Sequence, residues 1–476
     1  MEEVRRARDA AAGADLVEVR LDGVADPDPA AALDGRLRPV IVTCRPRWEG
    51  GCFDGSEEER RRVLVGAIAA GAEYVDVELR AGFAGEILRL RRGRGVVVSM
   101  HQFGPRSGDL EGQMRALRST GADVVKLAVE VDSLAETLPL YELGRRAGQE
   151  GGRQGHVLIA MGPRGTHTRV LAARLRNRWT YAGEGVAPGQ LPVDRLLVEF
   201  RFRRISPDAD LYGVVGAPVS QSLSPAMHNA GFAHVGLAAT YLALEARDAD
   251  DFVTFARAMG LRGASITAPL KVEMLNRVDE CDPLASRVGA INTLVIRDGR
   301  WIGTNTDLAG FVTPLKGRMA LRGTRAAVLG AGGAARAVAV ALKGEGARVR
   351  ICARRADQAR DVAAQLRVLA GPFPPRPGTW DVLVNATSSG SQPGDVNPMA
   401  GMRLDGEIVF DLTYSPEVTP LIAQARAAGC WTIGGIEMLI GQAERQFELW
   451  TGEAPPAGLF RAAVETARGW KTGVRA

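Results

Sequence analysis

The sequence has 476 residues, of which 46% are hydrophobic and 24% charged, and its formal net charge is +5. This length predicts two or three domains, and the composition is typical of a globular protein. No apolar run approaches the roughly 18 residues of a membrane helix, and the opening MEEVRRARDA lacks the apolar region of a signal peptide. The charge is modest and dispersed, which argues against a nucleic-acid partner.

The cysteines and lysines narrow the chemistry further. Five cysteines, with no C-x-x-C pair and no histidine-rich ligand spacing, predict a reduced, cytoplasmic protein without a metal site. Because the chain uses arginine for most of its positive charges, a lysine inside an apolar segment indicates a task that needs an amine, as nucleophile or base. Only five of the 60 basic residues are lysines: Lys126, Lys271, Lys316, Lys343 and Lys471.

In the N-terminal part of the chain, short segments rich in valine and isoleucine alternate with apolar helical stretches. Strand–helix alternation of this kind predicts a parallel sheet. Seven such units without a glycine-rich nucleotide loop favour a closed (β/α)8 barrel over an open sheet. The seven predicted strands are 16–21, 40–45, 74–79, 96–101, 124–129, 156–161 and 179–183.

In such a barrel, catalytic groups lie at the carboxyl ends of the strands. Lys126 is flanked there by Val125 and Leu127, and burial would favour its reactive, neutral amine. One alternative is that polar residues at strand ends are merely solvated, and another is that Lys126 is a structural lysine paired with an acid such as Glu78. The polar residues expected at the barrel mouth are Glu18, Arg20, Arg45, His101, Lys126 and Arg169.

Five motifs in this region, EVRLD, TCRPRWEGG, SMHQF, DVVKLAV and APGQ, resemble type I 3-dehydroquinate dehydratase across nearly all of residues 1–203. The resemblance implies that Lys126 forms a Schiff base with the substrate ketone, while His101, oriented by Glu49, moves the protons of the dehydration. The implied substrate contacts are Arg169 for the carboxylate and, for the ring hydroxyls, Glu18, Arg20, Arg45 and Gln190.

The chain departs from this resemblance in two places. Val186 stands just ahead of APGQ, in the lid loop, where the family usually has a serine. The sequence also begins in what resembles the first helix of the barrel, so the family's first strand is missing. We therefore expect either that the natural reading frame starts upstream, or that the barrel is gapped and less stable than the rest of the chain.

A polar, proline-containing segment, SPDAD at 206–210, predicts a domain boundary. Beyond it, a strand at 211–216 leads into a loop that carries Ser222 and Ser224. The short motifs GASITAPLK, GAINTL and GTNTD follow, and they include Lys271 and Asp307. Taken alone, Lys271 could be a solvated residue at the start of a helix, and Asp307 could be the N-cap of the next helix.

The stretch RAAVLGAGGAARAVAVAL at 325–342 predicts a strand, a glycine-rich turn and a helix. Gly330, Gly332 and Ala335 fit the dinucleotide pattern G-x-G-x-x-[GA], with the helix N-terminus available for a pyrophosphate. The next strand ends in Arg354 and Arg355, where an NAD-binding chain would carry an acid. Two arginines favour a 2′-phosphate and therefore NADP, although in an arginine-rich chain they could also be simply solvated.

These motifs, together with NATSSG, DLTYSP and GGIEMLIGQAERQFELWTG, resemble shikimate dehydrogenase over residues 211–476. The resemblance implies that Ser222 and Ser224 bind the substrate carboxylate and that Lys271 and Asp307 handle the carbonyl proton during hydride transfer. The ring hydroxyls would be held by Thr267, Asn292, Tyr414 and Gln442. The implied cofactor-binding residues are Gly330, Gly332, Gly333, Ala334, Arg354, Arg355, Asn385, Thr387 and Gly435.

One position in this half departs from the family. Ser265 stands where the family usually has an asparagine ahead of the Ile-Thr pair, and we expect local adjustment there rather than loss of the site.

The sequence thus predicts an α/β protein with two consecutive activities on small-molecule substrates, dehydration of 3-dehydroquinate and NADPH-dependent reduction to shikimate. Quinate oxidation and a non-catalytic sensor of pathway intermediates are the alternatives. The oligomeric state and any direct transfer of the intermediate stay open. The predicted domains are a dehydratase-like barrel at 1–205, a substrate domain at 210–312 and 438–476, and a Rossmann NADP-binding domain at 313–437.

Overall fold

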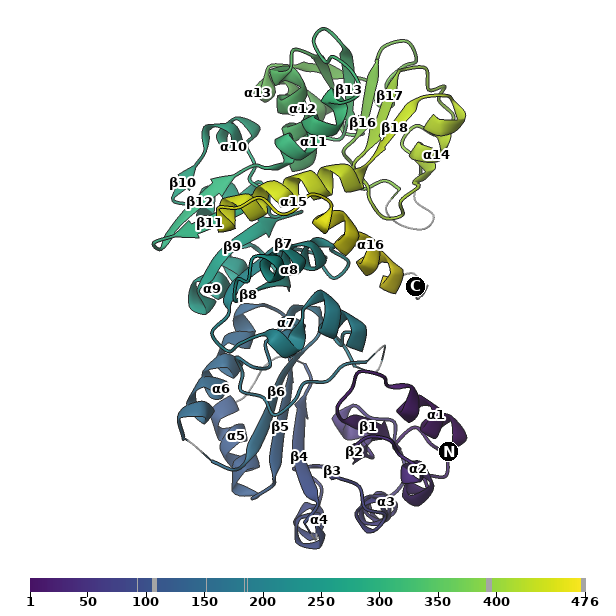
Figure 1. Ribbon diagram of the computed structural model, residues 1–476, viewed down its shortest axis with the longest axis vertical. Helices are drawn as coiled ribbons and strands as arrows, with labels where there is room; N and C mark the ends of the chain where they lie inside the picture. Colours follow the sequence, from purple (N-terminus) through teal and green to yellow (C-terminus); the bar gives the residue numbers. More distant parts are fainter. Residues whose placement is uncertain are drawn as a thin grey trace. The chain divides into compact units, whose positions relative to one another are not determined.

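The structure is a computed structural model, shown in Figure 1. It describes residues 1–91, 93–104, 109–150, 152–183, 185, 187–390 and 396–471. The chain divides into two compact units. The first unit consists of Met1–Ala209, Leu242–Arg247 and Thr254–Met259. The second unit consists of Asp210–Tyr241, Asp248–Val253 and Gly260–Ala476.

The N-terminal sheet has six strands that lie in chain order and run parallel to one another. Its central strands are buried along most of their length, which suits the β-branched side chains that fill them. The predicted α/β class with a parallel sheet is therefore confirmed. The strands are β1 (Val17–Arg20), β2 (Val40–Thr43), β3 (Tyr74–Glu78), β4 (Gly95–Gln102), β5 (Val124–Glu130) and β6 (Gly155–Met161).

Helices connect these strands and cover the sheet (Figure 1). The helix at Glu57–Ala69 begins at a capping box, in which Ser56 accepts the Glu59 N–H and the Glu59 side chain accepts the Ser56 N–H. The helices are α1 (Glu2–Ala10), α2 (Pro29–Leu33), α3 (Glu57–Ala69), α4 (Ala84–Leu90), α5 (Leu110–Ser119), α6 (Leu138–Glu150) and α7 (His167–Val170).

The prediction of a seventh strand at 179–183 is wrong. Just before it, the Asn177 side chain donates to the carbonyl of Leu158 and accepts its N–H, both at 2.9 Å, and so occupies the edge of β6. Trp179 and Tyr181 pack into the core of the sheet. Aromatic packing rather than a hydrogen-bonded ladder therefore holds this segment.

At the other edge, no strand in the described part of the chain lies beyond β1. The segment that leads into β1 is instead tied to the end of the unit, because Arg203 donates to the carbonyl of Gly13 at 2.8 Å and to the Asp15 carboxylate at 2.9 Å. The described sheet is therefore a curled half-barrel.

A second, mixed sheet follows in the chain, with the strand order β10-β12-β11-β9-β7-β8. β7 runs parallel to β9, whereas β11 is antiparallel to both β9 and β12. The strands are β7 (Asp210–Gly216), β8 (Ala239–Glu245), β9 (Leu261–Ile266), β10 (Glu280–Cys281), β11 (Thr293–Arg297) and β12 (Arg300–Thr304). The helices of this region are α8 (Ser224–His234), α9 (Ala249–Met259), α10 (Pro283–Val288) and α11 (Asp307–Lys316).

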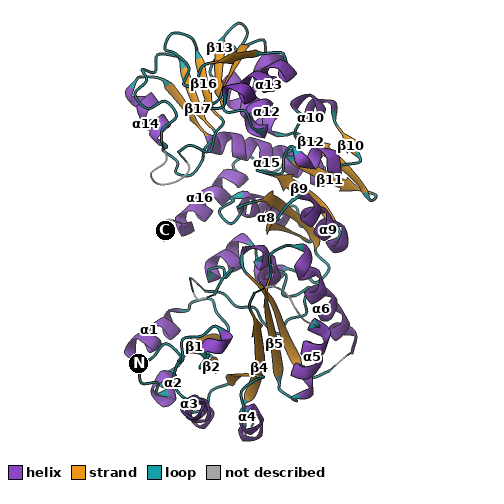
Figure 2. Ribbon diagram, turned by 180° about the vertical axis from the view of Figure 1, so that it is seen from behind, coloured by secondary structure: helices purple, strands orange, loops and turns teal. Residues whose placement is uncertain are grey.

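The third sheet is parallel, and its order β15-β14-β13-β16-β17-β18 is that of dinucleotide-binding folds, 3-2-1-4-5-6. Helices α12 and α13 lie over one face and α14 over the other, as Figure 2 shows. The strands are β13 (Arg325–Leu329), β14 (Arg348–Cys352), β15 (Leu369–Gly371), β16 (Val382–Asn385), β17 (Ile408–Asp411) and β18 (Trp431–Gly434). The helices are α12 (Gly333–Gly344), α13 (Ala356–Leu366) and α14 (Pro420–Ala427).

Two final helices, α15 (Gly435–Thr451) and α16 (Leu459–Lys471), follow this sheet. α15 crosses α11 at very short range: a Cβ on Gly310 would lie 2.6 Å from the Met438 carbonyl and 2.7 Å from the Gln442 nitrogen. Only glycine permits this approach. Among the described helices, none is both long enough and apolar enough to cross a bilayer.

Candidate active sites

Lys126 of β5 lies in the interior of the half-barrel, with only 7% of its side chain exposed. Its Nζ is 3.4 Å from Oδ2 of Asp76 on β3 and 4.3 Å from the ring centre of Tyr181. The acid beside Lys126 is therefore Asp76 rather than Glu78. Burial opposes ionisation of Asp76, but Arg45 and Lys126 outweigh it and lower the pKa of this carboxyl.

His101, near the end of β4, faces Glu49 of the short helix Arg47–Glu49. One carboxylate oxygen, Oε2, accepts the backbone N–H of His101 at 2.6 Å and lies 3.0 Å from its Nδ1. Burial lowers the pKa of His101 well below its usual value, and Arg45 and Lys126 act in the same direction. The imidazole is therefore neutral at neutral pH, with N–H on Nδ1 and a free lone pair on Nε2.

Arg45 anchors a buried ion cluster beneath Lys126. Its Nη1 donates to Glu78 and to Ser99, and its Nη2 donates to Asp76, all at 2.7 Å. Arg60, itself fully buried, pairs with the other oxygen of Glu78. Arg45 was expected to hold ring hydroxyls, but in the structure its terminal nitrogens donate to Asp76, Glu78 and Ser99.

Arg169, of α7, is 2% exposed, and none of the described acidic residues pairs with it. Its Nη1 and Nη2 donate to the carbonyls of Ala160 and Pro188 at 3.0 and 3.2 Å, while its Nε is buried without a partner. Burial alone lowers its pKa to about 10. The Oε1 of Gln190, in the neighbouring APGQ turn, is also buried without a partner. A buried guanidinium with an unpaired N–H is well suited to receive an anion, and the Gln190 oxygen is available to accept a hydrogen bond from a hydroxyl.

The remaining predicted contacts of this site lie on and after β1. Glu18 accepts a hydrogen bond from the Thr43 hydroxyl at 2.7 Å. Arg20 forms a two-pronged ion pair with Asp22, with both distances 2.7 Å. Val186 lies outside the described residues.

In the second unit, Lys271 and Asp307 form an ion pair of 2.5 Å between Nζ and Oδ2. The other oxygen of Asp307 accepts from Nδ2 of Asn292 at 2.7 Å, and the same nitrogen lies 3.3 Å from Oε1 of Gln442. Asp307 is the first residue of α11, whose N-cap is Thr306, so its carboxylate serves the ion pair and not the helix end. The structure thus brings four of the predicted residues together.

The other predicted substrate residues lie on separate segments. Ser222 accepts the backbone N–H of Ser224 at 3.2 Å, and Ser224, at the start of α8, is 3% exposed. Thr267 follows β9 directly and is partly buried. Tyr414 follows β17, and its backbone carbonyl accepts from Arg468 of α16 at 2.7 Å.

The glycine-rich turn joins β13 to α12. Gly330 has φ +112°, a left-handed conformation that favours glycine, and Gly332 caps α12 without any side-chain hydrogen bond. A Cβ on Gly333 would lie 3.3 Å from both Cβ and Cδ of Lys271. The N-terminus of α12, with Ala334 next in the chain, therefore offers backbone N–H groups to a phosphate directly beside the lysine.

Two further loops approach the same edge of the sheet, at the point where the strand order reverses between β13 and β16. Asn385 ends β16, accepts both the N–H and the hydroxyl of Thr387, and donates to Asp411 at 2.9 Å. At Gly435, a Cβ would lie 2.2 Å from the carbonyl of Leu412, so glycine is required where α15 begins.

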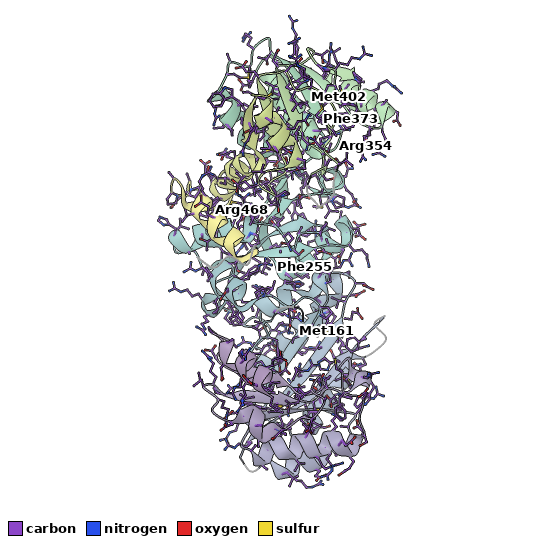
Figure 3. All side chains as sticks on the ribbon, turned by 90° about the vertical axis from the view of Figure 1, so that its right-hand side faces the viewer. Met161, Phe255, Arg354, Phe373, Met402 and Arg468 are labelled. Atoms are coloured by element: carbon purple, nitrogen blue, oxygen red, sulfur yellow. The ribbon has the colours of Figure 1, made fainter. Side chains whose placement is uncertain are left out.

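Arg354 and Arg355 follow β14, and both side chains are exposed. Figure 3 labels Arg354 in this part of the molecule. Two long, positively charged side chains beyond the second strand of this fold fit the 2′-phosphate of NADP, because a planar guanidinium can bind a phosphate through two hydrogen bonds.

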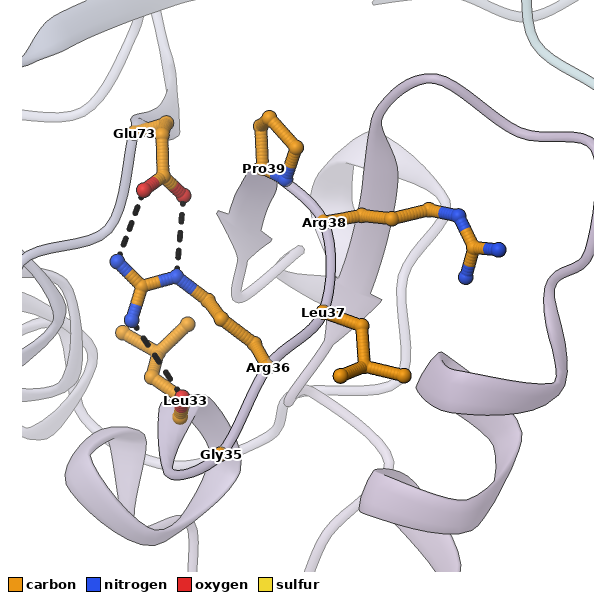
Figure 4. A pocket seen from close by; sticks show the side chains of 7 residues that line it. All are labelled: Leu33, Gly35, Arg36, Leu37, Arg38, Pro39 and Glu73. Atoms are coloured by element: carbon orange, nitrogen blue, oxygen red, sulfur yellow. Dashed lines mark hydrogen bonds and ion pairs between the residues drawn. The ribbon is translucent and has the colours of Figure 1, made fainter.

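A shallow pocket of about 440 Å³ lies at the amino ends of β2 and β3 (Figure 4). Inside it, Arg36 binds Glu73 through two nitrogens at 2.8 and 3.3 Å. The carboxylate of Glu73 also accepts the N–H of Val40, which begins β2. This pocket lies at the amino ends of the strands, opposite Arg45 and His101. In barrels, that end serves stability rather than catalysis.

Sequence reasoning missed several residues that now belong to the two sites. Asp76 and Tyr181 contact Lys126, and Gln446 donates to Thr293 and to the backbone of Asn292. Asp76 could have been found, because an acid in the apolar strand YVDVE has to be paired when buried. The other two carried no such signal.

Family models match three parts of the chain. Type I 3-dehydroquinase matches residues 1–206, the shikimate dehydrogenase substrate binding domain matches residues 214–294, and the shikimate 5′-dehydrogenase C-terminal domain matches residues 435–465.

Individual proteins match the same parts. The chloroplastic bifunctional 3-dehydroquinate dehydratase/shikimate dehydrogenase of Arabidopsis thaliana is 34% identical over 94% of this chain and 79% of its own length. A shikimate dehydrogenase (NADP(+)) of an Anaeromyxobacter species is 41% identical over 53% of this chain and 95% of its own. The structure of shikimate 5-dehydrogenase from Thermus thermophilus with NADP(H) and shikimate covers 54% of this chain and 99% of its own, with 35% identity and a TM-score of 0.50. The chain therefore belongs to the bifunctional 3-dehydroquinate dehydratase/shikimate dehydrogenase family.

Proposed function

We propose that this chain carries out two consecutive reactions, dehydration of 3-dehydroquinate to 3-dehydroshikimate and NADPH-dependent reduction of that product to shikimate. The observation that carries the proposal is that each unit holds its own lysine–aspartate pair beside the groups its reaction needs. Lys126 and Asp76 lie near a neutral histidine, and Lys271 and Asp307 lie against a nucleotide turn.

For the dehydration, we propose that Lys126 is the nucleophile. Its Nζ attacks the C3 carbonyl of 3-dehydroquinate, and loss of water gives a protonated imine. Asp76 is a weak hydrogen-bond partner of the lysine, because the same carboxylate also accepts from Arg45 at 2.7 Å and from Ser99 at 2.6 Å. The 3.4 Å separation of Nζ from Asp76 is long for an ion pair, which suits an amine that has to be released for attack.

His101 then moves the protons. Its free Nε2 removes the C2 proton, and the electron pair flows into the imine to form an enamine. The imidazolium returns this proton to the C1 hydroxyl, which leaves as water, and hydrolysis of the conjugated imine frees Lys126. Glu49 holds Nδ1–H throughout, so that the reactive nitrogen is always Nε2.

The substrate carboxylate is proposed to bind Arg169, which is buried without an acidic partner in the described part of the chain. Glu18, Arg20 and Gln190 are the proposed partners of the ring hydroxyls. Arg45 acts through Asp76 rather than by direct contact, because its terminal nitrogens already bind the buried acids.

For the reduction, bound NADPH supplies the hydride, and this chain's residues supply the proton and the orientation. Lys271 donates a proton to the carbonyl oxygen as it gains negative charge, and Asp307 takes part by keeping the ammonium in place at 2.5 Å. Asn292 fixes Asp307 from the other side. Ser222 and Ser224 are the proposed carboxylate ligands, Thr267, Tyr414 and Gln442 the hydroxyl contacts, and Arg354 and Arg355 the partners of the 2′-phosphate.

A single reaction mixture tests the proposal. With 3-dehydroquinate and NADPH, the wild-type protein should form a transient enone absorbance while the nicotinamide absorbance falls. Lys271→Ala should accumulate the enone, and Lys126→Ala should reduce added 3-dehydroshikimate but leave 3-dehydroquinate untouched. Consumption of neither substrate by the wild type would refute the proposal.

The quinate and sensor alternatives gain no support from the matches, which are to dehydratases and shikimate dehydrogenases. The paired reactive groups also argue against a sensor, since turnover and not binding requires them.

A further inference from the structure

Four polar side chains of the second unit lie behind the proposed reductase site and have no part in the reaction described above. They come from β8, β9, β11 and α15, and together they form a hydrogen-bonded chain that leads, through Asn292, to the ion pair of Lys271 and Asp307. Tyr241, Thr293 and Gln446 are 0% exposed and Ser265 is 6% exposed.

The connection is continuous. The Tyr241 hydroxyl donates to Ser265 Oγ at 2.5 Å. Ser265 donates to Oε1 of Gln446 at 2.7 Å, and Nε2 of Gln446 donates to Thr293 at 2.9 Å. The Thr293 hydroxyl donates to Oδ1 of Asn292 at 2.7 Å, and Nδ2 of Asn292 donates to Asp307 at 2.7 Å.

The direction of these bonds is fixed by backbone groups. Nε2 of Gln446 lies 3.1 Å from the backbone carbonyl of Asn292, which can only accept, so the amide has to present Oε1 to Ser265. Ser265 must then donate to Gln446 and accept from Tyr241.

The far end is fixed in the same way. Oδ1 of Asn292 accepts the backbone N–H of Thr306 at 2.7 Å, which turns Nδ2 towards Asp307. Both amides are therefore held in one orientation, and Ser265 is the only member of the described connection whose hydroxyl links Tyr241 to Gln446.

We propose that Ser265 is a positioning residue for shikimate turnover: it sets the direction of this hydrogen-bond chain and so orients Gln446 and, through Thr293, the Asn292 side chain that holds Asp307. The inference rests on the proposed reductase function. A site ordered in this way before substrate arrives loses little on binding.

The test is Ser265→Ala, assayed for shikimate oxidation by NADP⁺. The substitution leaves Gln446 Oε1 and the Tyr241 hydroxyl unpaired, so we expect kcat/KM for shikimate to fall about tenfold, through KM for shikimate, while KM for NADP⁺ stays within about twofold. Ser265→Thr keeps the hydroxyl and should restore shikimate KM. Recovery by threonine separates positioning from a general loss of stability, which thermal unfolding of each variant measures directly.

Two controls sharpen the result. Thr240→Val, next to Tyr241 on the same strand, removes a hydroxyl that is 1% exposed and has no partner, and it should leave both KM values unchanged. Tyr241→Phe should raise shikimate KM like Ser265→Ala. The double variant should show no larger KM than the more impaired of the two single variants, because both substitutions interrupt the same hydrogen-bond chain.

The outcomes are separable. Additive losses in the double variant, or an unchanged shikimate KM in Ser265→Ala, would overturn the inference. If the wild type itself fails to oxidise shikimate, the proposed function fails, and calorimetric binding of shikimate to wild type and to Ser265→Ala still decides the positioning role: about tenfold weaker binding supports it, and equal binding overturns it.

Discussion

At the scale of single residues, the contact between Glu49 and His101 has a measurable pH signature. Burial raises the pKa of Glu49 from 4.5 to about 7. Since the folded value lies above the unfolded one, the stabilising contribution of the protonated carboxyl is complete below about pH 4.5 and is lost as the pH rises through about 7.

Glu49→Gln, which stays neutral, should therefore be more stable than the wild type at pH 8, by up to about 3 kcal/mol, and nearly equal to it at pH 5. Thermal unfolding of both proteins at the two pH values measures this difference. The same variant should lose dehydratase activity, because an amide holds Nδ1–H of His101 less firmly than a carboxylate. A stability difference that does not change between pH 5 and pH 8 would contradict the assignment.

Lys126→Arg should abolish dehydration and leave the reductase unchanged, because a guanidinium keeps the charge beside Asp76 but is not a nucleophile at neutral pH. Borohydride added with 3-dehydroquinate should trap an adduct on the wild type, and peptide mapping should place it on Lys126. An adduct on another lysine, or dehydration without any adduct, would show that the nucleophile lies elsewhere.

Arg354→Ala should raise KM for NADPH by about tenfold to a hundredfold, since charge-assisted bonds to a phosphate contribute roughly 1.5–3 kcal/mol. KM for NADH, which lacks the 2′-phosphate, should barely change and serves as the internal control. Equal use of both cofactors by the wild type would contradict the role of the two arginines.

At the scale of elements, the crossing of α11 and α15 decides how two site residues meet. α11 carries Asp307 and α15 carries Gln442, and Gly310 lies at the point where the helices touch. Gly310→Ala should cost about 1–3 kcal/mol of folding stability and lower reductase turnover, because the added methyl meets backbone atoms.

Gly344→Ala is the matched control, because a Cβ at that helical position meets nothing within 4 Å and alanine favours a helix. Thermal unfolding and reductase assays of both variants decide the matter. Equal stability of Gly310→Ala and the wild type would mean that the helices can move apart without cost.

Local patterns predicted the elements better than the contacts between them. The strand expected at 124–129 is β5, Val124–Glu130, because a run of β-branched residues is a local property. The strand expected at 179–183 does not form, because the side chain of Asn177 makes the hydrogen bonds to β6 that a neighbouring strand would make. No local sequence pattern reveals this arrangement.

The same limit applies to the sites. Lys126 was found from its apolar surroundings and Lys271 with Asp307 from their motifs, and the structure joins the latter pair. The link from Lys126 to Asp76 spans 50 residues and depends on which strands are neighbours. Arg45 was predicted to hold ring hydroxyls, because its partners on β3 are visible only once the sheet is assembled.

At the scale of the whole molecule, the two reactions are expected to fail separately. The N-terminal sheet has an open edge at the partly exposed strand β1 in the described part of the chain, and each backbone group that is both unpaired and buried there costs about 1–3 kcal/mol. On heating, dehydratase activity should be lost at a lower temperature than reductase activity. Samples taken along one temperature ramp and assayed for both reactions measure this, and a more heat-resistant dehydratase would contradict it.

The contact of Gly333 with Lys271 also limits how reductase variants can be interpreted. Enzymologists sort mutations into those that change affinity for the coenzyme and those that change the rate of the chemical step. Here the glycine-rich turn and the proposed proton donor are in close contact, because a Cβ on Gly333 would lie 3.3 Å from both Cβ and Cδ of Lys271. A larger residue at position 333 requires the Lys271 side chain to shift by a few tenths of an ångström while it alters the turn. We therefore expect its effects on coenzyme affinity and on the chemical step to arise together.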